Sequence, residues 1–337
     1  MALDVPASSS DAAQRTEEAV EERVADRSPM AARAAGASAR DRRGSDTRVV
    51  TPTISVRQRL REIWLSRELL TYLVRTEIKV KYKNSVLGLI WSMVAPAMTL
   101  VIYWFVFGVV LKNGIPNFVI FLFAGLLLWN LFQFGVMSGT GVVVNNAGIV
   151  KKVSFPREIL ALAAVGSACV FFFFQAIVMV LFMIVLHHGP DWSYLPVTLL
   201  ALVTGIVLAA AIAVLLSSIN VYLRDTQHLI EVILTAWFWA CPIVYAYQKQ
   251  IGDRLGPQSL TWVYFLNPMV PLVLSFQRFI YADVTVTVNN APYGILPPKG
   301  MLWYVGLDLG VLFLATCLFL VALAVFGRLE GNFAEEL

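Results

Sequence analysis

The sequence predicts an all-α polytopic membrane protein. Of its 337 residues, 58% are apolar and only 14% are charged, whereas about a quarter of the residues in soluble globular proteins are charged. Runs without any charged residue cover 84–111, 113–150, 159–190, 192–223 and 232–248. A helix needs roughly 20 apolar residues to cross a bilayer, so most of these runs are long enough to do so.

The N-terminal segment, residues 1–53, has a different composition. It contains no aromatic residue, and its eight arginines nearly balance nine acidic residues. Such a segment buries too little apolar surface to offset the entropy lost on ordering. We expect a disordered cytoplasmic tail, and a regulatory or partner-binding role is the alternative.

Residues 54–83 are expected to form an amphipathic interface helix. Eight cations and three acids are interleaved there with apolar residues, a composition typical of helices that lie in the membrane interface and contact membrane lipids. The last four cations, Arg75, Lys79, Lys81 and Lys83, directly precede the first apolar run. A cationic flank favours the cytoplasmic side, where anionic lipid attracts it.

The transmembrane part, residues 84–337, is predicted to contain six spans. They are expected at about 86–111, 118–140, 158–187, 194–220, 229–247 and 301–327. Lys151, Lys152 and Arg157 place the second loop in the cytoplasm, and the loop around residues 189–191 has no cation and should lie outside. With six spans, both termini are cytoplasmic.

Residues 248–300 leave two alternatives open. The stretch 258–282 is apolar enough for a seventh span, but Asn267-Pro268 and Pro271 interrupt it. Broken helices at membrane depth are tolerated where protein or a cavity surrounds them. We therefore favour re-entrant helices on the outer face, between the fifth and sixth spans.

The motifs of several function classes are absent from the sequence. It has no Gly-x-x-x-x-Gly-Lys-Ser/Thr loop, no His-Glu-x-x-His motif and no Asp-x-Asp pair. Its net charge of +4 comes without a basic stripe, so a nucleic-acid partner is not expected. Cys169, Cys241 and Cys317 lie far apart in apolar segments and predict neither a metal site nor a disulfide. We expect no metal, no cofactor in this chain, and no enzyme activity.

The loop between the second and third spans is the first candidate functional segment. It runs from Asn145 to Arg157 and places cations beside Phe155-Pro156. This combination suits a short helix that docks on a soluble partner, although a plain positive-inside loop would look the same. The candidate residues are Asn145, Asn146, Lys151, Lys152, Phe155, Pro156 and Arg157.

A second candidate is the turn that holds Arg224 and Asp225, followed by Glu231. Charges at a membrane boundary suit ion pairs with a neighbouring helix or a partner. A solvated turn is the equal alternative.

The third candidate is a set of residues that could line a conduit. Aromatic rings can stack on sugars, but helix packing and interfacial belts also account for them. Asp308 is an acid well inside a predicted span, a position that is usually functional. The candidates are Trp104, Trp129, Trp237, Trp239 and Asp308.

From about residue 65 onward, the chain resembles the permease subunit of ABC-2 family transporters, in the branch that exports polysaccharides and polyol phosphates such as O-antigen or teichoic acid. The segments that carry the resemblance occur in the family order. They are residues 77–96, 149–160, 221–226, 241–245 and 327–337.

The resemblance implies a half-transporter in a bacterial cytoplasmic membrane. A second copy of the chain and two copies of a separate ABC ATPase would complete it, with ATP and Mg bound by the ATPase. The 145–157 loop would be the coupling helix, the 54–83 helix would touch the ATPase, and residues 248–300 would hold the outer gate helices. The substrate would be a lipid-linked glycan.

Three other functions remain open from the sequence. A drug or small-lipid exporter of the same superfamily would share these features. An ATP-independent channel or scaffold would need no ATPase. A membrane glycosyltransferase is disfavoured because the chain lacks an acidic pair and a large catalytic loop.

Overall fold

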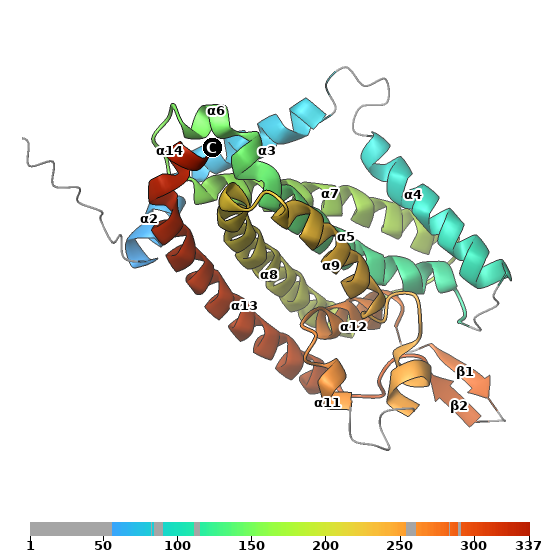
Figure 1. Cartoon of the computed structure of the whole chain (residues 1–337). Coiled ribbons are helices and arrows are strands. Elements are labelled where there is room, and N and C mark those ends of the chain that lie inside the picture. The colour runs from blue at the N-terminus through green and yellow to red at the C-terminus, as the bar shows by residue number, and fades with distance from the viewer. Residues whose placement is uncertain are drawn as a thin grey trace, which may run out of the picture. The chain divides into compact units, whose positions relative to one another are not determined.

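The computed structural model describes residues 56–81, 83, 90–110, 115–253, 261–282, 284–288 and 291–337 (Figure 1). The tail predicted at 1–53 lies outside these residues, and so does the start of the first predicted span. The described part is nearly all helical.

Four long helices form the centre of the bundle: α5 (Phe118–Asn145), α7 (Glu158–Val185), α8 (Leu195–Tyr222) and α13 (Met301–Leu329). Each has at least 28 residues, so each is roughly 42 Å long or more and exceeds the ~30 Å hydrocarbon core. By length and composition, these are the four described helices able to cross a membrane. They agree with four of the six predicted spans, and the total of six remains a prediction.

Helix α5 is the central element of the bundle. It packs against α7 on one side and α8 on another, and α13 packs against α8. Its most apolar window is 78% buried, against 28% for α13. Because α5 is apolar on all sides, it can be surrounded by protein, whereas α13 keeps a broad apolar face exposed.

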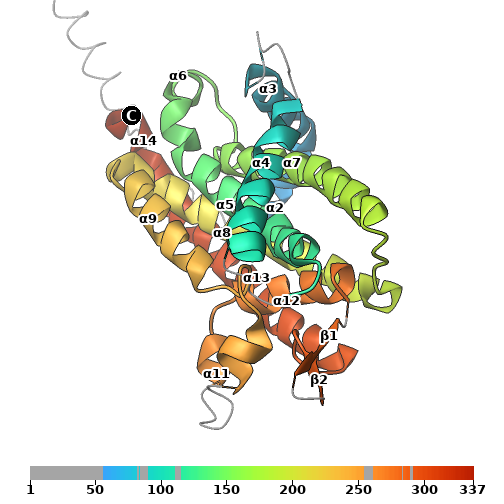
Figure 2. The same ribbon diagram turned by 90° about the vertical axis from the view of Figure 1, so that its right-hand side faces the viewer.

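The two remaining predicted spans correspond to shorter described helices. Helix α4 (Trp91–Tyr103) continues into a π-helical segment, η2 (Trp104–Val110), and α4 packs across α7 and α5 (Figure 2). Helix α9 (Thr226–Trp239) has 14 residues and is roughly 21 Å long. It ends eight residues before the predicted boundary at 247, because Pro242 disfavours helical backbone at the residue before it.

The helices described within residues 248–300 are all short: η4 (Gln248–Gly252), α11 (Thr261–Tyr264) and α12 (Met269–Ile280). Between α11 and α12, the Asn267 side chain accepts a hydrogen bond from the Met269 amide at 3.0 Å, which fixes the break. At 12 residues, or roughly 18 Å, α12 is too short for a seventh span. It is buried against α5, α8 and α13, and its predicted role as a re-entrant gate helix remains a prediction.

A β-hairpin corrects the expectation that the protein is purely helical. Strand β1 (Thr285–Val288) pairs antiparallel with β2 (Ala291–Gly294). The alternating, β-branched Thr-Val-Thr-Val segment followed by Asn289-Asn290 is a hairpin signal. This signal is short and lies within an otherwise helical chain, so helices alone were predicted.

The interface helix predicted at 54–83 consists of two helices, α2 (Val56–Leu65) and α3 (Arg67–Lys81). In both views, α6 (Ala147–Val150) and the C-terminal α14 (Phe333–Glu336) lie at one end of the bundle, opposite α11 and the hairpin (Figures 1 and 2). We call these the α6 end and the hairpin end. Helix α2 lies near α14 in Figure 1, and its Arg59 pairs with Glu330. Trp64 and Leu65 are exposed, as expected of a helix that contacts lipid.

Small residues allow α5 and α8 to pack closely. Gly135 and Gly139 of α5 face Ala209 and Ala213 of α8, four residues apart on each helix. Small residues at this spacing let helix backbones approach in membranes, where apolar surface alone gives little preference for protein over lipid.

Replacing Gly139 with Ala should destabilise the bundle. The added Cβ would lie 2.5 Å from the Cβ of Ala213, so the two helices would have to separate, and overpacking of this kind costs about 1–3 kcal/mol. The melting temperature of the purified protein, followed by tryptophan fluorescence, should fall. Gly310→Ala in α13 is the control, because nothing lies within 4 Å of its added Cβ. Equal melting temperatures would show that close packing at Gly139 is not required.

Candidate functional site

The candidate site lies at the α6 end and begins with the loop between α5 and α7. The Asn146 side chain donates a hydrogen bond to the Val142 carbonyl at 2.8 Å and stabilises the end of α5. The four-residue helix α6 follows, anchored by Val150, which is 1% exposed. Asn145 is exposed. The loop therefore has a fixed inner side and a free outer side.

The outer side of this loop carries both apolar and cationic groups. Ile149 and Val153 are 46% and 53% exposed, and Lys151 and Lys152 between them are also exposed. We call these four residues the loop face. Exposed aliphatic side chains beside two ammonium groups suit contact with an acidic protein surface.

Phe155, Pro156 and Arg157 occupy a different environment from the two lysines. All three are partly buried, and Phe155 packs against the core. The Arg157 guanidinium donates a hydrogen bond to the Glu330 carbonyl at 3.1 Å and lies 3.7 Å from the Glu330 carboxylate. The structure thus separates the predicted coupling residues into an exposed group and a group that binds within the chain.

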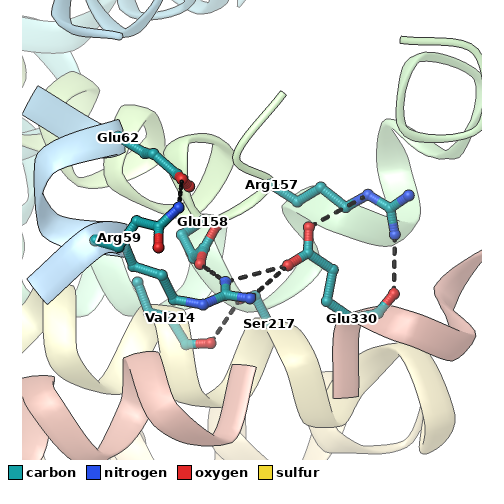
Figure 3. Close-up of polar contacts among 8 residues, drawn as sticks. Arg59, Glu62, Arg157, Glu158, Val214, Ser217 and Glu330 are labelled. Carbon is teal, nitrogen blue, oxygen red and sulfur yellow. Dashed lines mark hydrogen bonds and ion pairs between the residues drawn. The ribbon is translucent and has the colours of Figure 1, made fainter. Parts of the chain in front are cut away.

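Arg157 belongs to a cluster of two arginines and two glutamates (Figure 3). Arg59 of α2 donates hydrogen bonds to the carboxylates of Glu158, at the start of α7, and Glu330, just after α13. The contacts between Arg59 and Glu330 are 3.1 Å long. The Glu158 side chain is 1% exposed and that of Arg59 is 9% exposed. The cluster therefore joins three segments that are far apart in sequence.

The packing around this cluster leaves little free space. A Cβ added at Gly327 would lie 2.7 Å from the Arg59 Nε, so only glycine lets the guanidinium lie against α13. The Tyr222 hydroxyl donates to the Leu329 carbonyl at 2.8 Å, and its ring contacts Phe333. The C-terminal residues are thereby attached to α8 as well as to Arg59 and Arg157.

Arg59, Glu158 and Glu330 were not predicted as site residues. Arg59 is the one buried residue of α2, but in sequence it resembles its exposed neighbours Arg57 and Arg61. The Gly327-Arg-Leu-Glu-Gly ending was the available signal, since it places a glycine and an acid one turn apart. Only tertiary packing shows that Arg59 meets them.

The predicted charged turn is open to solvent in the described chain. Arg224, Asp225 and Glu231 are all exposed, and none of them belongs to the ion pairs found between described residues. No ion pair joins them to a neighbouring helix among the described residues. Contact with a partner remains a prediction for them.

The cations of the interface helix also differ from one another. Arg75, Lys79 and Lys83 are exposed without an ion pair to another described residue. Lys81 is exposed as well, but its Nζ lies 4.0 Å and 4.4 Å from the ring centres of Phe134 and Phe171. Partial desolvation lowers the pKa of this ammonium, and the charge of Glu77 partly raises it again.

The candidate conduit residues divide into surface and interior positions. Trp104 and Trp239 are 45% and 52% exposed, whereas Trp129 is 1% exposed. Trp237 donates a hydrogen bond to Asn267 at 2.7 Å. Asp308 is fully buried and accepts a hydrogen bond from Ser275 of α12 at 2.8 Å. These positions differ in exposure within the described chain, and a conduit lined by these five residues remains a prediction.

No group of three or more possible metal ligands (His, Cys, Asp or Glu) occurs among the described residues. The chemistry available at the α6 end is therefore ionic and apolar contact. Such contacts allow the α6 end to bind a partner and to transmit a displacement.

Comparisons with known proteins agree with this description. The profile of the ABC-2 type transporter family matches residues 68–280. An O-antigen export system permease protein of Myxococcus xanthus is 34% identical over 224 residues, which cover 66% of this chain and 84% of the relative. Two O-antigen export system permease proteins of Klebsiella pneumoniae are 27% and 28% identical over 270 residues, or 80% of this chain and 95% of each relative.

Replacing Arg59 with Met should destabilise the α6 end. The change keeps most of the side-chain volume but leaves the buried Glu158 carboxylate without its cation, and removing one partner of a buried ion pair costs about 3–5 kcal/mol. The melting temperature of the purified protein should fall clearly. Arg61→Met is the matched control, because Arg61 is exposed on the same helix. Equal melting temperatures for the two variants would show that the cluster does not hold α2 in place.

Proposed function

The chain belongs to the ABC-2 type transporter family, and we propose that it is the permease subunit of an ATP-driven exporter that carries a lipid-linked polysaccharide across the bacterial cytoplasmic membrane. The observation that carries this proposal is the similarity to O-antigen export permeases over 84–95% of their length. The four long apolar helices support a membrane location. The same relatives favour a polysaccharide over a drug or a small lipid as the substrate.

The energy source in this proposal is a separate ABC ATPase, present in two copies, which binds ATP and Mg. A second copy of this permease completes the transporter. Both termini lie in the cytoplasm, so the α6 end faces the ATPase. The exposed loop face supports this orientation, because it combines apolar and cationic groups where a partner could dock.

Force applied to the loop face has a short route into the bundle. Val150 anchors α6 in the core, and the loop ends at Arg157 and Glu158, which contact Glu330 and Arg59. Closure of the ATPase would therefore displace α5, α7, α2 and the end of α13 together. Such a change needs contacts that differ between the ATP-bound and ATP-free states, and the loop face supplies the contacts on this side.

The polysaccharide-export proposal predicts a specific defect on depletion. If production of this chain is stopped in its host, finished lipid-linked polymer should accumulate on the cytoplasmic side of the membrane. It should disappear from the cell surface. Gel analysis of polymer extracted from whole cells and from the cell surface alone separates the internal pool from the surface pool. Re-expression should restore the surface pool. Normal surface polymer in depleted cells would contradict the proposal, and so would a block in polymer synthesis.

The loop face should be required for binding the ATPase. The double variant Ile149→Ser/Val153→Ser removes two aliphatic contacts worth about 1–2 kcal/mol together when partly buried, so affinity for the ATPase should fall about tenfold. Pull-down and ATPase assays on the purified pair would measure this loss. Leu302→Ser is the control, because Leu302 is 85% exposed at the hairpin end. Equal ATPase binding by the two variants would contradict docking on the loop face.

A further inference from the structure

A cavity of about 550 Å³ lies between α3, α4, α5 and α7, away from the charged cluster. Its walls are largely apolar, but they include one ammonium group and three side-chain amides. These polar lining residues are Lys81, Asn130, Gln133 and Gln175. A cavity between membrane helices that presents this many polar groups suits an occupant that is itself partly polar.

Lys81 lies well along the bundle from the α6 end. The Ser167 hydroxyl of α7 donates to Glu77 at 2.7 Å, and the Lys81 Nζ lies over Phe171, also of α7. Phe171 is 13 residues after the start of α7 at Glu158, which corresponds to roughly 20 Å along the helix. Gly166 allows this approach, since a Cβ there would lie 2.7 Å from the Val74 side chain. Helix α3 therefore follows α7 and carries a cation toward the middle of the bundle.

Lys81 is exposed at the edge of the cavity, so an anionic group from outside the chain can reach its ammonium. None of the ion pairs between described residues involves Lys81. Glu77, one turn earlier, is bound by Ser167, and burial raises the pKa of its carboxyl. The two aromatic rings stabilise the ammonium but leave its N–H donors without an acceptor in the described chain.

The three amides have unused hydrogen-bonding capacity on the same cavity. Asn130 donates to Gln175 at 2.9 Å, and Gln133 accepts from Trp129 at 2.9 Å. Each amide group has two donors and a carbonyl with two lone pairs. Among the described residues, each of the three makes one side-chain hydrogen bond, so further donors and acceptors are available to hydroxyl groups of an occupant.

We propose that this cavity binds the headgroup of a phosphate-bearing lipid, with Lys81 on the phosphate and Asn130, Gln133 and Gln175 on the hydroxyl groups attached to it. The apolar walls between α4 and α7 accommodate the beginning of the lipid chain. Two sources share this chemistry: an ordinary anionic phospholipid, and the phosphate-linked carrier of the exported glycan. Assigning the headgroup to the carrier rests on the proposed export function, whereas the headgroup site itself does not.

Native mass spectrometry of the purified full-length chain can test this site with three probes. Phosphatidylglycerol and a polyprenyl phosphate bearing one sugar both contain phosphate, and diacylglycerol lacks it. We expect both phosphate lipids to bind more tightly than diacylglycerol. Lys81→Met should weaken their binding about tenfold, because charge-assisted hydrogen bonds to phosphate are among the strong ones. Gln175→Leu should weaken binding of the sugar-bearing lipid further than that of phosphatidylglycerol.

Lys79→Met is the matched control, since Lys79 lies on the same helix and is exposed like Lys81 but does not line the cavity. Tighter binding of the sugar-bearing lipid, lost in Lys81→Met but kept in Lys79→Met, supports the site and identifies the glycan carrier. Equal binding of both phosphate lipids with the same dependence on Lys81 supports the site with a membrane phospholipid as its occupant. Equal losses in the two lysine variants overturn the proposal, as does equal binding of diacylglycerol. Lipid binding is measured without an ATPase, so this result is independent of whether export itself is demonstrated.

Discussion

The contact of Arg59 with Glu158 and Glu330 determines how the α6 end is assembled. A buried ion pair contributes little net stability, because the cost of removing both charges from water offsets most of their attraction. The ion pair has a stronger effect on the position of α2 than on the net stability of the fold. A buried carboxylate without its cation is unfavourable, so α2 is favoured in the position that pairs Arg59 with Glu158. The cluster therefore fixes a position, which is the requirement for a segment that transmits force.

Helix α5 connects this end to the rest of the molecule. It is the most buried of the long helices, and its close approach to α8 at Gly139 leaves no room for independent sliding. Close-packed interiors respond to displacement as units, not by continuous deformation. A shift of the loop after Asn145 must then move α5 together with α8, and α13 follows through its contact with α8. The exposed faces of α7 and α13 have no such restraint from the described residues.

Composition and charge-free length were enough to predict the long helices, because only a helix satisfies its backbone over such apolar runs. They did not predict where α9 ends, since Cys241-Pro242 reads as part of a continuing apolar segment. The hairpin at 285–294 was missed because its pattern is only four residues long on each side. The four cations of α3 look equivalent in sequence, yet only Lys81 meets aromatic rings. That difference depends on how α3 packs against α7, which Gly166 permits and no local pattern encodes.

The loop face and the Lys81 cavity are connected by the same two helices. The loop joins α5 to α7, and the cavity is lined by Asn130 and Phe134 of α5 and by Phe171 and Gln175 of α7. The hydrogen bond between Asn130 and Gln175 crosses between these helices at 2.9 Å, so relative movement of α5 and α7 would change this bond and the space beside it. Long-range coupling requires an element with two arrangements that both sites influence. The α5–α7 pair meets the structural part of that requirement, because one end carries the loop face and its middle forms the wall of the cavity.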